Sequence, residues 1–200
     1  MKTKCALFLT TVLIAGIGCA GSTEKEVSSN EGPKIDYYKL GQEISSAAQT
    51  ELLNHVKSAL EKGGPVHAIK YCNVHASPLT DSLSQLYNCE ISRVALKNRS
   101  PHNTPKNIEE KMLLNNMLEA SLEGSMVNDT LVVNDGNLVY YKAIYIGMET
   151  CLKCHGQKGA DIDNETVVAL NELYPNDIAT NYRMGEFRGS WKISFRPPSN

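Results

Sequence analysis

Five consecutive residues, Cys151-Leu152-Lys153-Cys154-His155, constrain this 200-residue chain more than any other feature. They form the C-x-x-C-H pattern of c-type haem attachment. The spacing has a mechanical basis: both sulfurs can reach the vinyl groups of one haem, and the next side chain brings an imidazole beneath the iron. The pattern therefore predicts one covalently attached haem c, held by Cys151 and Cys154 with His155 as an axial ligand. Gly156 would let the backbone leave the crowded haem edge without a Cβ.

Three other chemistries use closely spaced cysteines. A thioredoxin-like redox pair would open a helix in a βαβ unit, and this sequence shows no such unit. A zinc site would need two further ligands at partner spacing, but there is no second C-x-x-C and no H-x-x-x-H. A structural disulfide stays open but gives no reason for the adjacent His155. Haem attachment is the favoured interpretation.

The N-terminal residues predict export from a bacterial cytoplasm. Residues 1–18 carry two early lysines, an apolar run and small residues at the end, which is the pattern of a signal peptide. The apolar run is too short to span a bilayer as a helix. Gly16-Ile17-Gly18-Cys19 resembles a lipobox, so we expect lipid attachment at Cys19 and a lipoprotein anchored to the membrane, facing the periplasm. Cleavage without lipidation, giving a free periplasmic protein, is the alternative.

Composition bounds the rest of the chain. A content of 42% hydrophobic and 21% charged residues is that of one ordinary soluble domain. The net charge of −2 and the pI of about 6.2 give no basic footprint for nucleic acid. Residues 19–35 are small and polar and predict a flexible tether, so the domain is expected over 36–200. Membrane contact is expected through the lipid anchor alone.

Apolar periodicity predicts an α+β domain with one small antiparallel sheet packed with helices, preceded by a long N-terminal helix. That helix begins at Asp36 and ends at Gly63-Gly64, and a second helix starts at Pro65, with a kink expected at Pro78. The other expected helices cover 108–122 and 165–173, and the expected strands cover 89–97, 130–133, 138–146 and 189–195. The hairpin turn is expected at 134–137 and a structured loop at 98–107. In the 108–122 helix, the residues expected to face inward are Met112, Leu113, Met117 and Leu118.

The second axial position of the iron has several candidates in the sequence. They are the thiols Cys72 and Cys89, the histidines 55, 67, 75 and 102, and the methionines 112, 117, 126, 148 and 184. Cys72 lies in the apolar stripe of its helix, where a sulfur would face the core, although a buried cysteine can serve simply as a small hydrophobe. His75 lies on the same side of that helix, and a Cys72–Cys89 disulfide is a further possibility in an oxidising compartment.

Four ordered blocks give the chain a family resemblance. They are AIKYCNVHA (68–76), RSPHNTPKN (99–107), CLKCHG (151–156) and YPNDIATNYRMGEFRGSWKISF (174–195). Together they resemble the exported single-haem c-type cytochrome domain family with a PAS-like fold and Cys/His haem ligation. The resemblance covers about residues 36–196. It implies thioether links at Cys151 and Cys154, His155 as one axial ligand and Cys72 as the other.

The resemblance has two departures, because Ser100 and Lys106 stand where the family loop has Asn and Asp. The resemblance therefore assigns no role to those two side chains. Near the C-terminus, Arg183 and Arg188 are candidate partners for the haem propionates, since guanidinium groups suit paired carboxylates. A surface salt bridge is the alternative for each of them.

His/Cys ligation predicts a low reduction potential, because a thiolate stabilises ferric iron. We therefore expect a monohaem c-type cytochrome that responds to redox state or to a small gaseous ligand through displacement of Cys72. The alternative is a membrane-tethered electron carrier of the periplasm. A haem enzyme would need an open coordination position, so no enzymatic activity is expected. The expected partner is a separate redox or signalling protein.

Overall fold

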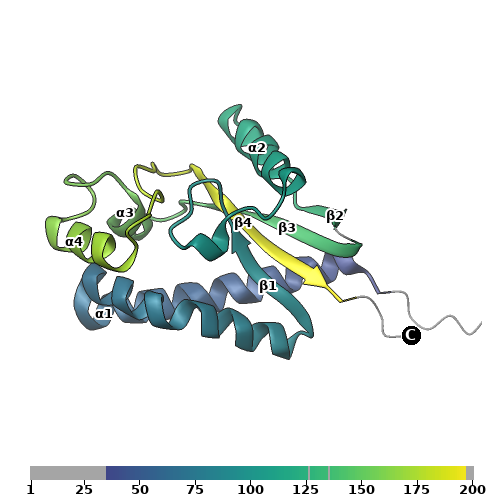
Figure 1. The fold of residues 1–200 in the computed structure, drawn as a ribbon, viewed down its shortest axis with the longest axis horizontal. Helices are drawn as coiled ribbons and strands as arrows, with labels where there is room; N and C mark the ends of the chain where they lie inside the picture. The colour runs from purple at the N-terminus through teal and green to yellow at the C-terminus, as the bar shows by residue number, and fades with distance from the viewer. Residues whose placement is uncertain (1–34, 126, 135, 197–200) are drawn as a thin grey trace, which may run out of the picture. The chain divides into compact units, whose positions relative to one another are not determined.

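A four-stranded antiparallel sheet forms the centre of the computed structural model, which describes residues 35–196 except 126 and 135. The predicted signal peptide and tether, the predicted lipid site Cys19 and the candidate ligand Met126 lie outside the described residues. Within the described ranges, no helix is long and apolar enough to cross a membrane. Figure 1 shows the order of the elements along the chain.

Helix α1, Tyr37–Leu86, is a helical hairpin whose two arms meet at Gly63 and Gly64. Asp36 caps its N-terminus by accepting hydrogen bonds from the backbone N–H groups of Tyr38 and Lys39. Gly64 has φ of 68°, a left-handed conformation that glycine adopts without a Cβ clash. The prediction of two helices separated by Gly63-Gly64 is therefore confirmed. The second arm keeps helical backbone angles through Pro78.

The sheet has the strand order β1-β4-β3-β2, with every pairing antiparallel. Its strands are β1 (Cys89–Val94), β2 (Thr130–Asn134), β3 (Asn137–Tyr145) and β4 (Phe187–Phe195). The hairpin predicted at 134–137 joins β2 to β3. Strand β1 ends three residues before the predicted end at Lys97, because the N–H of Ala95 donates to the carbonyl of Asn103 in the following loop.

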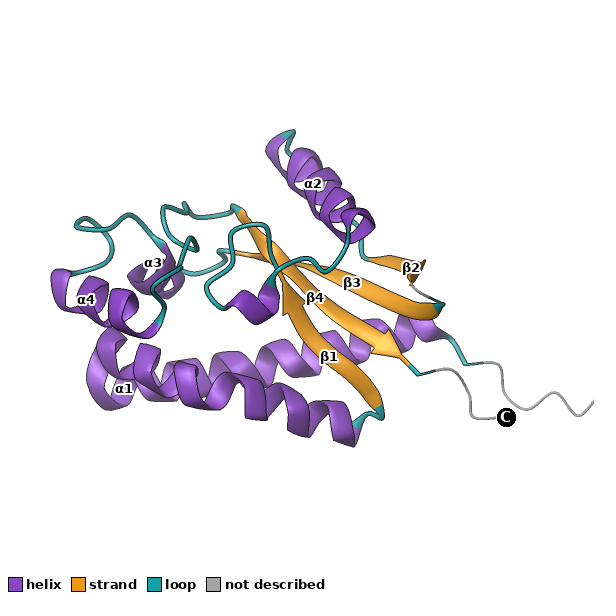
Figure 2. Ribbon diagram, in the orientation of Figure 1, coloured by secondary structure: helices purple, strands orange, loops and turns teal. Residues whose placement is uncertain are grey.

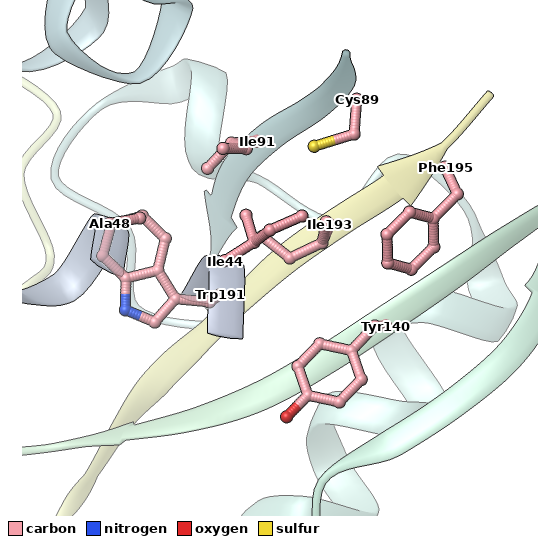
Figure 3. Close-up of a cluster of buried hydrophobic side chains, with 8 residues drawn as sticks. All are labelled: Ile44, Ala48, Cys89, Ile91, Tyr140, Trp191, Ile193 and Phe195. Atoms are coloured by element: carbon pink, nitrogen blue, oxygen red, sulfur yellow. The ribbon is translucent and has the colours of Figure 1, made fainter. Parts of the chain in front are cut away.

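The two faces of the sheet bury different clusters. Side chains from β1, β3 and β4 meet α1 on one face, which Figure 3 shows with Ile44 and Ala48 of α1 beside Trp191 and Ile193 of β4. On the other face, Leu114 and Met117 of helix α2, Ile108–Leu122, join the second cluster. The inward position predicted for Met112 is wrong, because 58% of that residue is exposed. Leu114 is buried there instead.

Two short helices, α3 (Glu149–His155) and α4 (Asn164–Leu173), lie together at one end of the sheet. Figure 2 shows them near the turn of α1. Ile69 of the second α1 arm packs with Leu170 of α4 and with Ile162, which fixes α4 against α1. A 3₁₀ turn, η1 (Pro101–Asn103), lies in the predicted structured loop. The helices and the single antiparallel sheet confirm the predicted α+β class.

Candidate haem site

The C-x-x-C-H motif forms most of helix α3 rather than an isolated turn. Cys151 and Cys154 are three residues apart, so their side chains lie on neighbouring parts of one helix face. Cys154 packs with the cluster around Ile69 and Leu170, and Cys151 packs with the cluster around Ile146 and Tyr182. Both sulfurs are free thiols, and both residues are partly buried. Burial raises the pKa of the Cys154 thiol to about 11.

The imidazole of His155 is held in one tautomer by the backbone. Its Nδ1 lies 2.8 Å from the carbonyl oxygen of Ala179. A carbonyl oxygen can only accept, so Nδ1 carries the proton and Nε2 keeps its lone pair. Burial, together with the nearby Arg188, Arg99 and Arg93, holds the pKa of His155 well below its usual range. The ring is therefore neutral, with Nε2 available to coordinate iron.

Arg99 and Asp177 brace the segment that supports His155. The Nε of Arg99 lies 3.1 Å from a carboxylate oxygen of Asp177, and the side chains are 13% and 4% exposed. The other oxygen of Asp177 accepts the N–H of Ala179 at 2.8 Å. Arg99 also donates to the carbonyl of Cys154. One guanidinium thus ties the loop after β1 both to α3 and to the segment that carries the Ala179 carbonyl.

Cys72 lies on the second arm of α1, one turn after Ile69. Ile69 and Cys154 belong to the same cluster, so this face of α1 is the one that meets the haem motif. Burial raises the pKa of the Cys72 thiol, while Arg93 and Arg99 act in the opposite direction. The nearby Cys72 also contributes to the raised pKa of the Cys154 thiol. The fold therefore brings Cys72 to the same end of the molecule as the motif.

Cys89 lies elsewhere. It begins β1 opposite Phe195 and is buried in the cluster between the sheet and α1 (Figure 3). Arg93, which influences Cys72, is four residues further along the strand, a distance of roughly 13 Å at strand rise. Both Cys72 and Cys89 are free thiols in this structure. The Cys72–Cys89 disulfide considered from the sequence is therefore absent from it.

The other candidate axial ligands have varied surroundings. Met117 is buried in the cluster under α2, whereas Met112, Met148 and Met184 are exposed. His67, His75 and His102 are also exposed. His55 is partly buried between the two α1 arms, where its Nδ1 lies 2.7 Å from the hydroxyl of Tyr71. His75 lies one helical turn after Cys72, and its ring packs against Tyr71 with the centroids 4.3 Å apart.

A cavity of about 180 Å³ lies beside Cys72, between the two arms of α1. Its walls include Leu52, Val56, Tyr71 and His75. A larger and more polar cavity of about 300 Å³ adjoins His55 and Tyr71 on the same hairpin. The lining of these cavities does not include the motif residues of α3. Cys72 thus borders open volume between the two arms of α1.

Gly156 is required by the packing at the end of α3. A Cβ at this position would lie 2.5 Å from the Cβ of Asp161 and 2.7 Å from the carbonyl oxygen of Leu152. Asp161 cannot easily move, because its carboxylate accepts the N–H of Gln157 at 2.8 Å. The glycine therefore lets the chain leave α3 and turn tightly against its own last turn.

Three residues of this site were not among the candidates from the sequence: Arg93, Asp177 and Ala179. Asp177 and the Ala179 carbonyl follow α4 in a loop without regular structure, so their contacts with Arg99 and His155 depend on the tertiary fold. Arg93 did have a signal: it continues the inward alternation of Cys89 and Ile91 on β1, where a cation is unusual. Arg183, a predicted propionate partner, is exposed, whereas Arg188 lies over the ring of Tyr182 beside His155.

Comparison with known protein families gives one match over most of the chain. The family model described as Tll0287-like matches residues 22–196. The chain belongs to the Tll0287-like family. The match includes both cysteine-bearing regions of the site, Cys72 on α1 and the motif on α3. The family resemblance predicted from the four ordered blocks is confirmed.

A solved member supports the fold of the Tll0287-like chain. The crystal structure of the cyanobacterial heme-protein Tll0287 aligns with a TM-score of 0.57 at 19% sequence identity, covering 81% of this chain and 97% of that chain. At this identity the likeness concerns the fold, and the predicted PAS-like architecture with a long N-terminal helix is confirmed. No curated protein matches the sequence.

Proposed function

We propose that this member of the Tll0287-like family binds one haem c, which Cys151 and Cys154 hold through thioether bonds and His155 ligates through Nε2. The observation that carries the proposal is the hydrogen bond between Nδ1 of His155 and the Ala179 carbonyl, because it leaves Nε2 as the coordinating atom. The partly buried free thiols of Cys151, one turn before His155, and of Cys154, directly before it, suit covalent attachment. The relative with the solved structure is called a heme-protein.

Cys72 is our proposed second axial ligand. It lies on the α1 face that packs toward Cys154. Burial raises the pKa of its thiol, and the charges of Arg93 and Arg99 act in the opposite direction, toward a negatively charged sulfur. Bound haem would supply an iron that changes redox state and accepts a small gaseous ligand when one coordination position opens. The cavity of about 180 Å³ beside Cys72 gives its side chain and helix arm room for adjustment.

We infer a low reduction potential and a sensing role from this ligand set. A thiolate favours ferric iron, and its displacement on reduction or gas binding would alter the contacts of α1. The alternative role is an electron carrier. Its iron would also have two protein ligands, and both would stay bound in the oxidised and the reduced state. We propose that a separate redox or signalling protein receives this signal.

Covalent attachment is tested by haem staining of full-length protein made with the cytochrome c maturation machinery. Cys151→Ala and Cys154→Ala should each reduce the haem that survives denaturing electrophoresis. Cys89→Ala, a change at a cysteine in a different cluster, should leave the stain at the wild-type level. Undiminished staining of the double variant at 151 and 154 would overturn the proposal.

The ligand and the role are tested by redox-titrated visible spectroscopy. Cys72→Ala should change the ferric spectrum and raise the midpoint potential, whereas Cys89→Ala should change neither. Carbon monoxide added to reduced wild-type protein should bind if Cys72 is displaced on reduction. Failure of carbon monoxide to bind, together with a stable six-coordinate spectrum in both states, would favour the electron carrier instead.

We also propose that the chain is exported and anchored through lipid at Cys19. The support is the sequence of residues 1–19. Metabolic labelling with a radioactive fatty acid should mark the wild-type protein and leave Cys19→Ser unlabelled. Release of the Cys19→Ser protein into the periplasmic fraction is the expected companion result, and retention of label in that variant would contradict lipidation at this residue.

A further inference from the structure

Three arginines gather at the end of the sheet where His155 lies. Arg93 comes from β1, Arg99 from the loop that follows it, and Arg188 from β4. All three act on His155, because each contributes to the lowering of its pKa. A guanidinium stays charged in proteins, so partial burial of several such groups calls for anions nearby.

Arg99 has its anion within the chain. Its Nε pairs with Asp177 at 3.1 Å, and its terminal nitrogen donates to backbone carbonyls. Within residues 35–196, apart from the two undescribed positions, neither Arg93 nor Arg188 forms an ion pair. Lys97, whose Nζ lies 4.0 Å from the centre of the Tyr182 ring, and Glu186 carry opposite charges that offset each other.

Arg188 is held beside His155 by neutral contacts. One terminal nitrogen donates to the carbonyl of Lys97 at 2.8 Å, and the guanidinium lies 5.4 Å from the centre of the Tyr182 ring. That ring in turn meets the imidazole of His155 edge to face, with centroids 6.3 Å apart. The remaining N–H groups of Arg188 can therefore receive an acceptor next to the proposed axial ligand.

Arg93 reaches the same region from the α1 face of the sheet. It follows Cys89 and Ile91 at alternate positions of β1, and both of those residues face α1. Its guanidinium lies 5.8 Å from the centre of the Trp191 ring, which is its cross-strand neighbour. Burial lowers the pKa of Arg93, and the nearby Cys72 and Tyr174 act to raise it.

The charged side chains of this cluster leave an excess of positive charge. With the Cys72 thiol neutral, as its raised pKa implies, three guanidinium groups and the one carboxylate of Asp177 sum to +2. We propose that Arg93 and Arg188 are the receptors for two carboxylates of one bound molecule, the propionates of the haem. The inference rests on the proposed function, since haem brings two carboxylates on one edge. It assigns no such role to Arg183, which is exposed and whose backbone N–H donates to Glu186.

The test compares ferric haem with its dimethyl ester, which has the same ring and iron but no carboxylates. Full-length Cys151→Ala/Cys154→Ala protein is titrated with each compound, so that covalent attachment does not obscure affinity. Arg93→Gln and Arg188→Gln should each weaken haem binding about tenfold, as the loss of a hydrogen bond to a charged group predicts, and should leave ester binding unchanged. The matched control Arg183→Gln should change neither affinity.

The possible outcomes are distinct. If the parent binds haem but the arginine variants weaken haem and ester equally, the arginines act on the fold or on the iron ligands, and the inference is overturned. Unchanged haem affinity in both variants overturns it as well. If the parent binds neither compound, the proposed haem site itself fails.

A second measurement uses the covalently loaded protein and needs no reconstitution. The infrared carboxylate bands of the haem propionates should shift in Arg93→Gln and Arg188→Gln and stay in place in Arg183→Gln. Arg93→Lys and Arg188→Lys keep the charge and serve where a glutamine variant does not fold. Bands that are identical in wild type and in all four variants at 93 and 188 would overturn the inference.

Discussion

The Nδ1 of His155 lies 2.8 Å from the carbonyl oxygen of Ala179, in a loop that follows α4. The orientation of the imidazole is therefore set by a segment outside the helix that carries it. That segment is positioned by Asp177, which accepts the Ala179 N–H and pairs with Arg99. A change at Asp177 should reach His155 without touching it.

Asp177→Asn should destabilise the protein by about 3 kcal/mol, because it leaves the Arg99 guanidinium partly buried without its counter-charge. Arg99 and Asp177 are 13% and 4% exposed, so solvent screens their pair only weakly. Urea unfolding followed by circular dichroism measures the loss. Lys57→Gln breaks the exposed pair with Glu61 and should change stability by less than about 0.5 kcal/mol. Equal unfolding midpoints for the two variants would contradict the role of Asp177.

Gly156→Ala should cost about 2 kcal/mol by overpacking. The new Cβ would stand 2.5 Å from Asp161 and 2.7 Å from the Leu152 carbonyl, and the latter is backbone that cannot turn aside. Gly147→Ala is the matched control, since a Cβ there meets nothing within 4 Å. Thermal unfolding of both variants checks this. A Gly156→Ala protein as stable as Gly147→Ala would show that the end of α3 can relax.

Glu110 makes the stability of the fold change with pH in the acid range. Its buried carboxylate lies 2.7 Å from Nζ of Lys192 and also accepts from the Tyr141 hydroxyl and the Lys106 N–H. Burial acts to raise the pKa of Glu110, but these hydrogen bonds and the Lys192 charge bring it below its usual value. A lowered folded pKa means that the stabilisation is complete above the unfolded pKa of about 4.3 and is lost as the pH falls through the folded value.

Glu110→Gln should therefore be less stable than wild type near neutral pH by roughly 3 kcal/mol, since Lys192 loses its buried partner. The difference should shrink as the pH falls below about 4. Urea unfolding across the acid range measures both curves. Parallel curves at every pH would contradict the assignment of this pH dependence to Glu110.

Cys89 should behave as a small apolar residue. It is 1% exposed, and burial raises its pKa to about 11. Cys89→Ser would bury a hydroxyl in an apolar cluster and should cost about 1–3 kcal/mol, with Cys89→Ala costing less. Wild-type stability should be the same with and without a reducing agent. A marked loss of stability on reduction would point to a disulfide and contradict the free-thiol structure.

Local patterns were sufficient for most elements of this fold. Apolar spacing and the Gly63-Gly64 pair predicted both α1 arms, and helix α2 and the β2–β3 hairpin lie where spacing and turn residues placed them. The predicted end of β1 at Lys97 and the predicted inward position of Met112 were wrong, because they depend on the loop at Asn103 and on how α2 packs on the sheet. Neither is encoded in a short window of sequence.

The candidate site divides in the same way. The motif on α3 is local and can be recognised from five residues. The Ala179 carbonyl has no signal in the sequence, because any residue offers a carbonyl, and the contact of Asp177 with the Ala179 N–H depends on the fold of a loop. Arg188 was predicted beside the site and is found there, while Arg183 points to solvent. Arg93 was not a candidate, although its place in the inward alternation of Cys89 and Ile91 on β1 is unusual for a cation.

The position of Cys72 on the second α1 arm means that the two proposed iron ligands become available at different stages of folding. His155 is adjacent to the attachment cysteines, so that ligand is present as soon as the motif is synthesised, even in an unfolded chain. Cys72 precedes the motif by a long stretch of sequence and reaches it only when α1, α3 and α4 have docked. Under the proposed ligation, the colour of the protein would therefore distinguish a chain that merely carries haem from one that has completed its fold.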